Sequence, residues 1–85
     1  MFYSSSRFRK QFKKSPKKIY LAAFDRLVVL EKSEFDVVLN SHKLSGKYAG
    51  YRSINITGDI RIVYKRVPNG FYLVAIGTHS ELYKK

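Results

Sequence analysis

The chain has no cysteine, which excludes a disulfide framework and any cysteine-based zinc site. It has only two histidines, His42 and His79, and neither lies among carboxylates in a pattern that would complete a metal site. Apolar runs such as residues 27–30 are too short to cross a bilayer, and no segment is typical of a secretory signal peptide. We therefore expect a cytoplasmic protein with no metal, no small-molecule cofactor and no membrane partner.

Acidic residues are also scarce. Six Asp and Glu stand against 17 Lys and Arg, so the formal net charge is +11. Residues 1–20 contain no acid, residues 21–40 contain four of the six, and positive charge returns from Lys43 to Arg66. This distribution predicts a polyanionic partner, because such charge gives affinity and fast encounter without sequence specificity. The alternative is a basic domain whose charge is only a solvated face.

At 85 residues the chain is expected to form one domain, residues 1–85, with a modest core. Phe2 and Tyr3 can form a short edge strand. A basic helix is then expected from the serines at 4–6, which offer N-cap hydroxyls, to Lys14.

A second helix follows the first after a short break. Ser15 and Pro16 are typical of an N-cap and a first helical residue. An amphipathic stripe comes after them, made of Ile19, Ala22, Ala23, Leu27 and Leu30. We expect a helical hairpin whose outer face carries the N-terminal Lys and Arg, followed by a short helical turn at residues 35–39.

From Tyr51 the apolar period changes to two, which indicates strands. A three-residue loop at 57–59 would pair Ile56 with Ile60, Ile54 with Ile62, and Asn55 with Arg61. A similar loop at 68–70 would pair Tyr64 with Val74, Ile62 with Ile76, and Arg61 with Gly77. The result is a three-stranded antiparallel meander with one apolar face for the helices to cover: Ile54, Ile56, Ile60, Ile62, Tyr64, Val74 and Ile76.

The opposite face of this meander holds Asn55 and Arg61 among the small residues Ala75 and Gly77. Small side chains around an arginine leave room for a ligand backbone. His79 is two residues beyond Gly77, so strand alternation would direct it to the same face. We therefore expect sheet pairing to gather Arg61 and His79 into one pocket that is open to solvent.

Two further segments have the composition of a nucleotide site. Residues 41–52 are rich in Gly, Ser and Tyr and are cationic, which offers cations for phosphate and rings for bases. His79 and Tyr83, four positions apart, lie on one side if the end of the chain is helical. Histidine can transfer protons near neutral pH, and tyrosine can stack on a base. A histidine in a loop is also often just solvated.

Four short motifs occur in order along the chain: His-Lys-Leu-x-Gly from 42, Gly-Tyr-Arg from 50, Gly-Asp-x-Arg-x-x-Tyr from 58, and Gly-Thr-His-x-x-Leu-Tyr from 77. In this order the chain resembles the RelE/ParE superfamily of toxin–antitoxin toxins, and within it the YafQ-like branch of ribosome-dependent mRNA endoribonucleases. The resemblance covers nearly all 85 residues. It implies an α+β fold, in which an N-terminal helical hairpin packs on a small twisted antiparallel sheet that ends in a short turn.

The resemblance also implies a function. The toxin would cleave mRNA in the A site of the 70S ribosome without a metal ion, and a cognate antitoxin would neutralise it. The ribose 2′-OH would attack the adjacent phosphate, which requires a base, positive charge at the developing phosphorane and an acid for the leaving oxygen.

By the same resemblance, His42 is the candidate base and His79 the candidate acid. Asp59 matches an aspartate that acts as a base or orients a histidine. Tyr83 matches an aromatic position that stacks on or orients the substrate, and Arg61 would stabilise phosphorane charge. Simpler interpretations remain open: Asp59 as a loop residue, Tyr83 as an anchor for the C-terminus, and Arg61 as a surface cation.

Candidate RNA contacts are Lys43, Lys47 and Arg52, with Asn55 standing where the branch usually has another histidine. Because an asparagine cannot move protons, Asn55 can at most hydrogen-bond, and the division of base and acid roles stays open. Ile60 and Ala75 also depart from the tryptophan and arginine common at these positions.

Two other functions are compatible with this sequence. One is a ParE-like toxin that inhibits DNA gyrase and cleaves nothing, although members of that branch generally lack the paired histidines. The other is a degenerate RNA-binding module that does not cleave, which the asparagine at position 55 makes credible.

Overall fold

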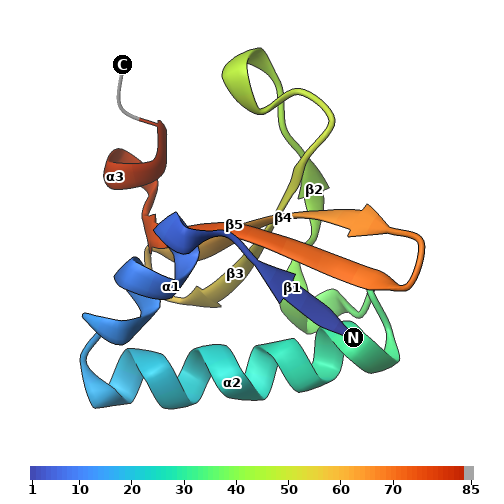
Figure 1. Ribbon diagram of the computed structural model, residues 1–85. Coiled ribbons are helices and arrows are strands. Elements are labelled where there is room, and N and C mark those ends of the chain that lie inside the picture. Colours follow the sequence, from blue (N-terminus) through green and yellow to red (C-terminus); the bar gives the residue numbers. More distant parts are fainter. Residues whose placement is uncertain (84–85) are drawn as a thin grey trace.

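Three helices pack on a five-stranded mixed sheet with the strand order β1-β5-β4-β3-β2 in the computed structural model, which describes residues 1–83 (Figure 1). The elements in chain order are β1 (Phe2–Ser4), α1 (Ser6–Lys13), α2 (Lys17–Lys32), the 3-10 turn η1 (Val37–Leu39), β2 (His42–Lys43), the 3-10 turn η2 (Gly46–Tyr48), β3 (Arg52–Thr57), β4 (Ile60–Val67), β5 (Gly70–Thr78) and α3 (His79–Tyr83). The predicted α+β fold, with its helical hairpin and antiparallel meander, is confirmed.

The sheet itself is larger than the predicted meander and is not purely antiparallel. Strand β1 pairs in parallel with β5, so that Phe2 lies opposite Phe71. At the other edge, β2 adds two antiparallel pairs to β3. Both edge strands are short, which limits the row of unpaired backbone groups that the sheet presents to solvent.

The start of α1 follows the predicted capping pattern, whereas the start of α2 does not. The Ser5 hydroxyl accepts a hydrogen bond from the Phe8 amide at 2.9 Å, as an N-cap does. The N-cap of α2 is Pro16, in extended geometry with ψ of 152°, and not Ser15. The Ser15 hydroxyl instead donates to the carbonyl of Gln11 at 3.0 Å, so it is committed to the preceding helix.

Two β-bulges change the predicted strand register. The first loop contains only Gly58 and Asp59, because Thr57 pairs with Ile60 and the ladder shifts between Asn55 and Thr57. Beyond the bulge, the predicted pairs of Ile54 with Ile62 and Asn55 with Arg61 are present. The expected pairing of Ile56 with Ile60 is therefore wrong, but both side chains remain on the apolar face.

The second bulge lies between β4 and β5. Tyr64 pairs with Leu73 and Val63 with Ala75, so Val74 is the extra residue and the predicted pairing of Tyr64 with Val74 is wrong. Because a bulge reverses the alternation of side chains, Val74 leaves the main core. Leu73 and Phe71 take its place, each 3% exposed.

Apolar side chains are buried on both faces of the sheet. The main core lies between the sheet and the helices α1 and α2 and includes Ala23, Leu27, Leu30, Ile54, Ile62 and Tyr64. On the other face, a second cluster joins Tyr48, Val63, Ala75 and Leu82. Ala75 is therefore covered, contrary to the expectation of an open face around it, and the loop with η2 and the helix α3 are both anchored to that face, opposite α2 (Figure 1).

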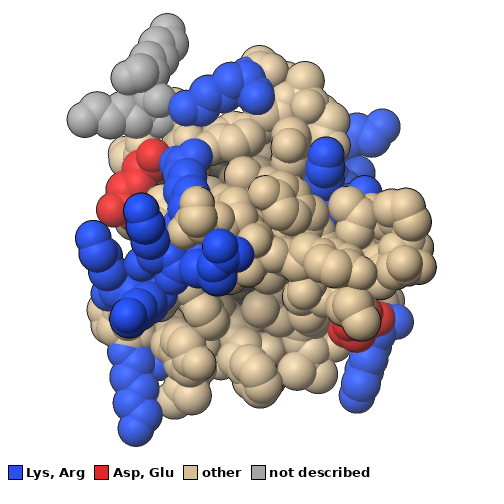
Figure 2. Space-filling model, in the orientation of Figure 1, with Lys and Arg blue, Asp and Glu red and all other residues tan. Residues whose placement is uncertain are grey.

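The outer surfaces of the two long helices differ. Figure 2 shows Lys and Arg gathered over α1 and the start of α2, as expected, whereas the middle of α2 is largely free of them. Its exposed residues Leu21, Phe24 and Val28 are 54%, 62% and 43% exposed. Together with Phe2 and Leu27, Phe24 and Val28 line a shallow apolar groove. The expectation of a basic outer face holds for α1 and for the first turn of α2, where Lys17 and Lys18 are exposed, but not for the rest of α2.

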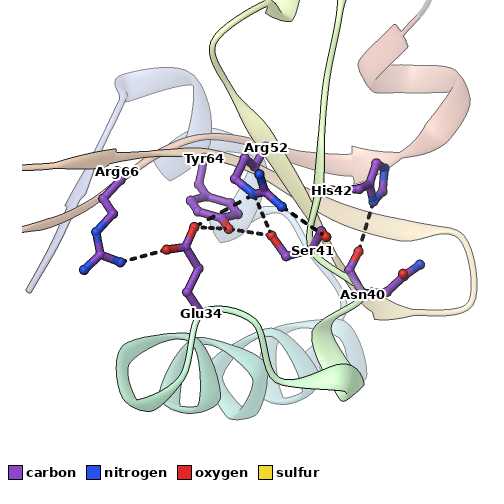
Figure 3. Close-up of polar contacts among 7 residues, drawn as sticks. All are labelled: Glu34, Asn40, Ser41, His42, Arg52, Tyr64 and Arg66. Atoms are coloured by element: carbon purple, nitrogen blue, oxygen red, sulfur yellow. Dashed lines mark hydrogen bonds and ion pairs between the residues drawn. The ribbon is translucent and has the colours of Figure 1, made fainter.

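A polar network joins the segment after α2 to the core face of the sheet (Figure 3). The side chain of Glu34 is only 8% exposed. Its carboxylate accepts a hydrogen bond from the Tyr64 hydroxyl at 2.9 Å and one from Arg66 Nη1 at 2.7 Å. The Tyr64 hydroxyl also lies 2.8 Å from the Ser41 hydroxyl, to which Arg52 Nε donates at 2.9 Å.

The environment of Tyr64 favours its protonated form. Burial of the hydroxyl, with a further contribution from the neighbouring Glu34 carboxylate, raises the pKa of Tyr64 from 10.0 to about 12. The phenol therefore remains a hydrogen-bond donor to Glu34 at any physiological pH.

This shift predicts a loss of stability in alkali. Because the pKa is higher in the folded state, its contribution is complete below pH 10.0 and decreases as the pH approaches about 12. Between about pH 9 and pH 11.5, the free energy of unfolding should fall by roughly 2 kcal/mol more in the wild type than in Tyr64→Phe, as measured by urea denaturation. Tyr72→Phe, which keeps the Tyr64 phenol, should follow the wild type. Equal losses in the wild type and Tyr64→Phe would contradict the assignment.

Candidate active-site cleft

A solvent-open cleft of about 530 Å³ lies between the β2–η2 segment, β4 and α3. Its lining residues are Asn40, His42, Leu44, Ser45, Arg61, His79 and Tyr83. It therefore brings together four of the five candidate catalytic residues, which come from three separate parts of the chain. The expected gathering of Arg61 and His79 in one open pocket is present.

Arg61 lies at the centre of a row that crosses three strands. It pairs with Asn55 of β3 on one side and with Gly77 of β5 on the other. Its Nη1 donates to Asn55 Oδ1 at 2.5 Å, and its Nε is buried without a partner among residues 1–83. Asn55 thus orients the guanidinium.

His79 is placed by the cap of α3. The Thr78 hydroxyl accepts from the Glu81 amide at 3.1 Å, and the Glu81 carboxylate accepts from the Thr78 amide at 2.8 Å. This reciprocal pair is a capping box. Gly77 makes room for it, because a Cβ at that position would lie 3.0 Å from Glu81 Oε1. Leu82 is fully buried and fixes the rotation of the helix on the sheet.

Tyr83 forms one wall of the cleft. The His79 and Tyr83 rings meet at 4.7 Å between centroids with an interplanar angle of 64°, and Tyr83 also meets the edge of Tyr48 at 5.8 Å. The ring of Tyr48 is in turn held by a hydrogen bond from Arg7 Nη1 to its hydroxyl at 3.0 Å. Tyr83 therefore both orients the imidazole and joins α3 to the η2 loop.

His42 has a defined hydrogen-bond partner. Its Nδ1 lies 2.9 Å from the carbonyl oxygen of Asn40 (Figure 3). Because a carbonyl oxygen can only accept, the neutral imidazole carries its proton on Nδ1, and Nε2 keeps a free lone pair. The contact depends on the left-handed backbone of Asn40, with φ of 46°. Asparagine tolerates this conformation, so an asparagine two residues before His42 is itself a local indication of such a turn.

Several predicted site residues lie outside the cleft. Asp59 is exposed in the two-residue turn between β3 and β4 and is not among the lining residues. Arg52 lies on the face toward α2, where it contacts Ser41 and stacks over the Phe35 ring at 5.0 Å. Lys43 pairs with Arg52 in the ladder and so shares that face. Lys47 lies in η2, with its Nζ 5.4 Å from the centroid of the Tyr48 ring.

Within residues 1–83, no three His, Cys, Asp or Glu side chains lie close enough together to hold a metal ion. None of the helices in the same range has the length and apolarity needed to cross a membrane. The cleft offers two imidazoles and a guanidinium, which suit proton transfer beside an anionic centre, whereas the Tyr83 hydroxyl is buried.

Solved structures share this fold at low sequence identity. A point mutant of YafQ from E. coli is 22% identical, with a TM-score of 0.79 over 98% of this chain and 97% of that one. The YoeB–YefM complex from Staphylococcus aureus is 19% identical, with a TM-score of 0.80 over 93% and 95%. The E. coli DinJ–YafQ complex is 22% identical, with a TM-score of 0.72 over 98% and 97%. The chain therefore shares the fold of these YafQ and YoeB structures.

The family assignment is narrower than the fold. The family described as "Bacterial toxin of type II toxin-antitoxin system, YafQ" matches residues 2–84. The chain belongs to this family, as the resemblance of its motifs predicted. A comparison with curated proteins found no match.

The capping box predicts that the stability of the protein depends on the hydroxyl of Thr78, the residue before His79. Thr78→Val keeps the shape of the side chain but removes the hydroxyl that accepts from Glu81, so the free energy of unfolding should fall by about 1 kcal/mol. Thr78→Ser keeps the hydroxyl and should lose clearly less. Urea denaturation of both variants checks the prediction, and a serine variant no more stable than the valine variant would contradict it.

Proposed function

We propose that the protein is a ribosome-dependent endoribonuclease that cleaves mRNA in the ribosomal A site, and that the cleft is its active site. The observation that carries this proposal is the presence of Arg61 and both imidazoles in one solvent-open cleft. Membership of the YafQ toxin family supports it, as does the net charge of +11, which favours association with the polyanionic ribosome.

The cleft contains the groups required for attack by a ribose 2′-OH. His42 Nε2 would accept the 2′-OH proton as the oxygen attacks the adjacent phosphorus. Arg61 would stabilise the negative charge of the phosphorane, and protonated His79 would donate its proton to the departing 5′ oxygen. The products are a 2′,3′-cyclic phosphate and a free 5′-OH, and no metal ion takes part.

The remaining candidates have smaller roles in this proposal. Asn55 holds Arg61 and transfers no proton, and Tyr83 orients His79 and offers a ring edge to a base. Lys47 lies in the loop beside the cleft and would contribute to phosphate binding. Asp59 lies outside the cleft lining, and we assign it no proton transfer. Lys43 and Arg52 lie on the other face, and we assign them no contact with the scissile phosphate.

We also propose that a cognate antitoxin covers the apolar outer face of α2. The DinJ–YafQ and YoeB–YefM structures are complexes of related toxins with partners. In this chain Leu21, Phe24 and Val28 are exposed on a helix that is also buried on its other side. Two copies that each carry a net charge of +11 would repel one another, so an acidic segment with apolar side chains fits this face better than a second copy.

The cleavage proposal is tested with purified protein, ribosomes and an mRNA positioned in the A site. His42→Ala, His79→Ala and Arg61→Ala should each lower the single-turnover rate by about 10²-fold or more, with the 5′-OH ends mapped on the mRNA. Arg9→Ala removes an equal charge from α1, away from the cleft, and should change the rate by less than about 3-fold.

Other outcomes would support the other functions. DNA damage on induction, with intact mRNA, would indicate a gyrase inhibitor. Ribosome binding without new 5′-OH ends would indicate a module that binds RNA but does not cleave it. Full activity in all three cleft variants would remove the catalytic assignment.

The antitoxin proposal predicts a selective loss of neutralisation. Phe24→Asp places a charge in the apolar face and should weaken antitoxin binding at least about 10-fold, while mRNA cleavage remains. Val37→Asp makes the same change at a residue that is 93% exposed elsewhere and should leave the affinity unchanged. Calorimetric titration of each variant with the antitoxin checks this, and unchanged affinity for Phe24→Asp would exclude this face.

A further inference from the structure

The segment that carries His42 has little secondary structure to hold it. Strand β2 contains two residues and lies at the edge of the sheet, with His42 opposite Ser53 and Lys43 opposite Arg52. Two ladder pairs at an edge are weak restraints on a side chain that must be held in one orientation. Some other interaction must therefore fix the backbone that precedes the imidazole.

That interaction is the polar network on the opposite face of the sheet, which we call the Glu34 clasp: Glu34, Ser41, Arg52 and Tyr64 (Figure 3). It holds Ser41, the residue immediately before His42, at two points. Its hydroxyl contacts Tyr64 at 2.8 Å and Arg52 Nε at 2.9 Å, and its carbonyl accepts from Arg52 Nη2 at 3.3 Å.

The hydrogen bonds of the clasp have one direction. Arg52 Nε donates to the Ser41 hydroxyl, and the Tyr64 hydroxyl donates its only hydrogen to Glu34. Ser41 must then donate to Tyr64, so every hydroxyl in the chain both accepts and donates. The raised pKa of Tyr64 keeps this arrangement intact, since an ionised phenol has no hydrogen to give. Hydrogen bonds linked in this way strengthen one another.

The other side of the segment is fixed as well. Leu39 is fully buried, and the Asn40 amide donates to the Val37 carbonyl at 3.2 Å. Asn40 is thus held between a buried residue and the clasped Ser41, in the left-handed conformation that directs its carbonyl to His42 Nδ1. Release of Ser41 would free this backbone and the carbonyl with it.

We propose that Glu34, Tyr64 and Ser41 are positioning residues for His42, which hold the Asn40 carbonyl on Nδ1 and so keep Nε2 unprotonated and directed into the cleft. The three residues lie outside the cleft lining and act through the backbone. The expected effect of these residues on cleavage rests on the proposed function. Their expected effect on the tautomer of the His42 imidazole is independent of that function.

The test compares paired variants. Tyr64→Phe and Ser41→Ala each remove one hydroxyl from the clasp and keep the remaining shape. Tyr72→Phe removes a tyrosine hydroxyl from β5 outside the network, and Ser41→Thr restores the lost hydroxyl. For each protein, the His42 tautomer is read from the ring ¹⁵N signals, and kcat and KM are measured separately for mRNA cleavage on the ribosome.

In the wild type, Tyr72→Phe and Ser41→Thr, we expect the neutral imidazole of His42 to carry its proton on Nδ1. In Tyr64→Phe and Ser41→Ala the Nε2-protonated form should become the larger fraction, because it is the form that imidazole prefers in water. Their kcat should fall about 10-fold or more, with KM changed less than about 2-fold. Glu34→Gln loses the charge but keeps an acceptor, so its tautomer fraction and its kcat should lie between those of the two groups. Because this change is milder, it also provides a test if Tyr64→Phe or Ser41→Ala does not fold.

Unchanged tautomer fractions in Tyr64→Phe and Ser41→Ala would overturn the proposal. So would a loss of kcat that simply follows the loss of folded protein in circular dichroism. If the wild type cleaves no mRNA while the tautomer still responds to the clasp, the proposed function fails and the positioning role stands.

Discussion

The row of Asn55, Arg61 and Gly77 across β3, β4 and β5 is the constraint on which the site depends. It places the guanidinium beside the amide that holds it, and it places at Gly77 a residue whose missing side chain leaves room for the Glu81 carboxylate. The same row sets where β5 ends, and therefore where α3 begins and presents His79. A shift of one residue in either ladder would turn Arg61 toward the main core, where an unpaired charge is strongly disfavoured.

The two faces of the sheet have different tasks. The face toward α2 holds the main core and the Glu34 clasp. The other face holds the smaller cluster around Leu82 and Tyr48, which anchors the two walls of the cleft. Because both faces are packed, the cleft lies on a rigid support, although two of its walls are a loop and a short helix.

Local chemistry explains which predictions were confirmed. The serine cap and the apolar stripe of α2 depend on near neighbours. The predicted pairing of Arg61 with Gly77 is present because the bulge at Val74 offsets a loop that is one residue shorter than expected. The predictions that were wrong involve interactions that cannot be inferred from the alternation of apolar and polar residues. The bulge between β4 and β5 displaces Val74 from the core, and no local pattern indicates that Glu34 is a buried acceptor for Tyr64 and Arg66.

The amino-acid sequence by itself determined the family, the order of helices and strands, and the residue types that the chemistry requires, because these depend on local pattern and composition. The meeting of Arg61 with His79 was expected from the strand pattern, whereas the tertiary structure decided which other residues meet. It placed His42 and His79 in one cleft, turned Arg52 to the opposite face and left Asp59 outside, since each position depends on contacts between residues far apart in the chain. Bulges and edge pairing, which arise only when strands assemble, determine these positions.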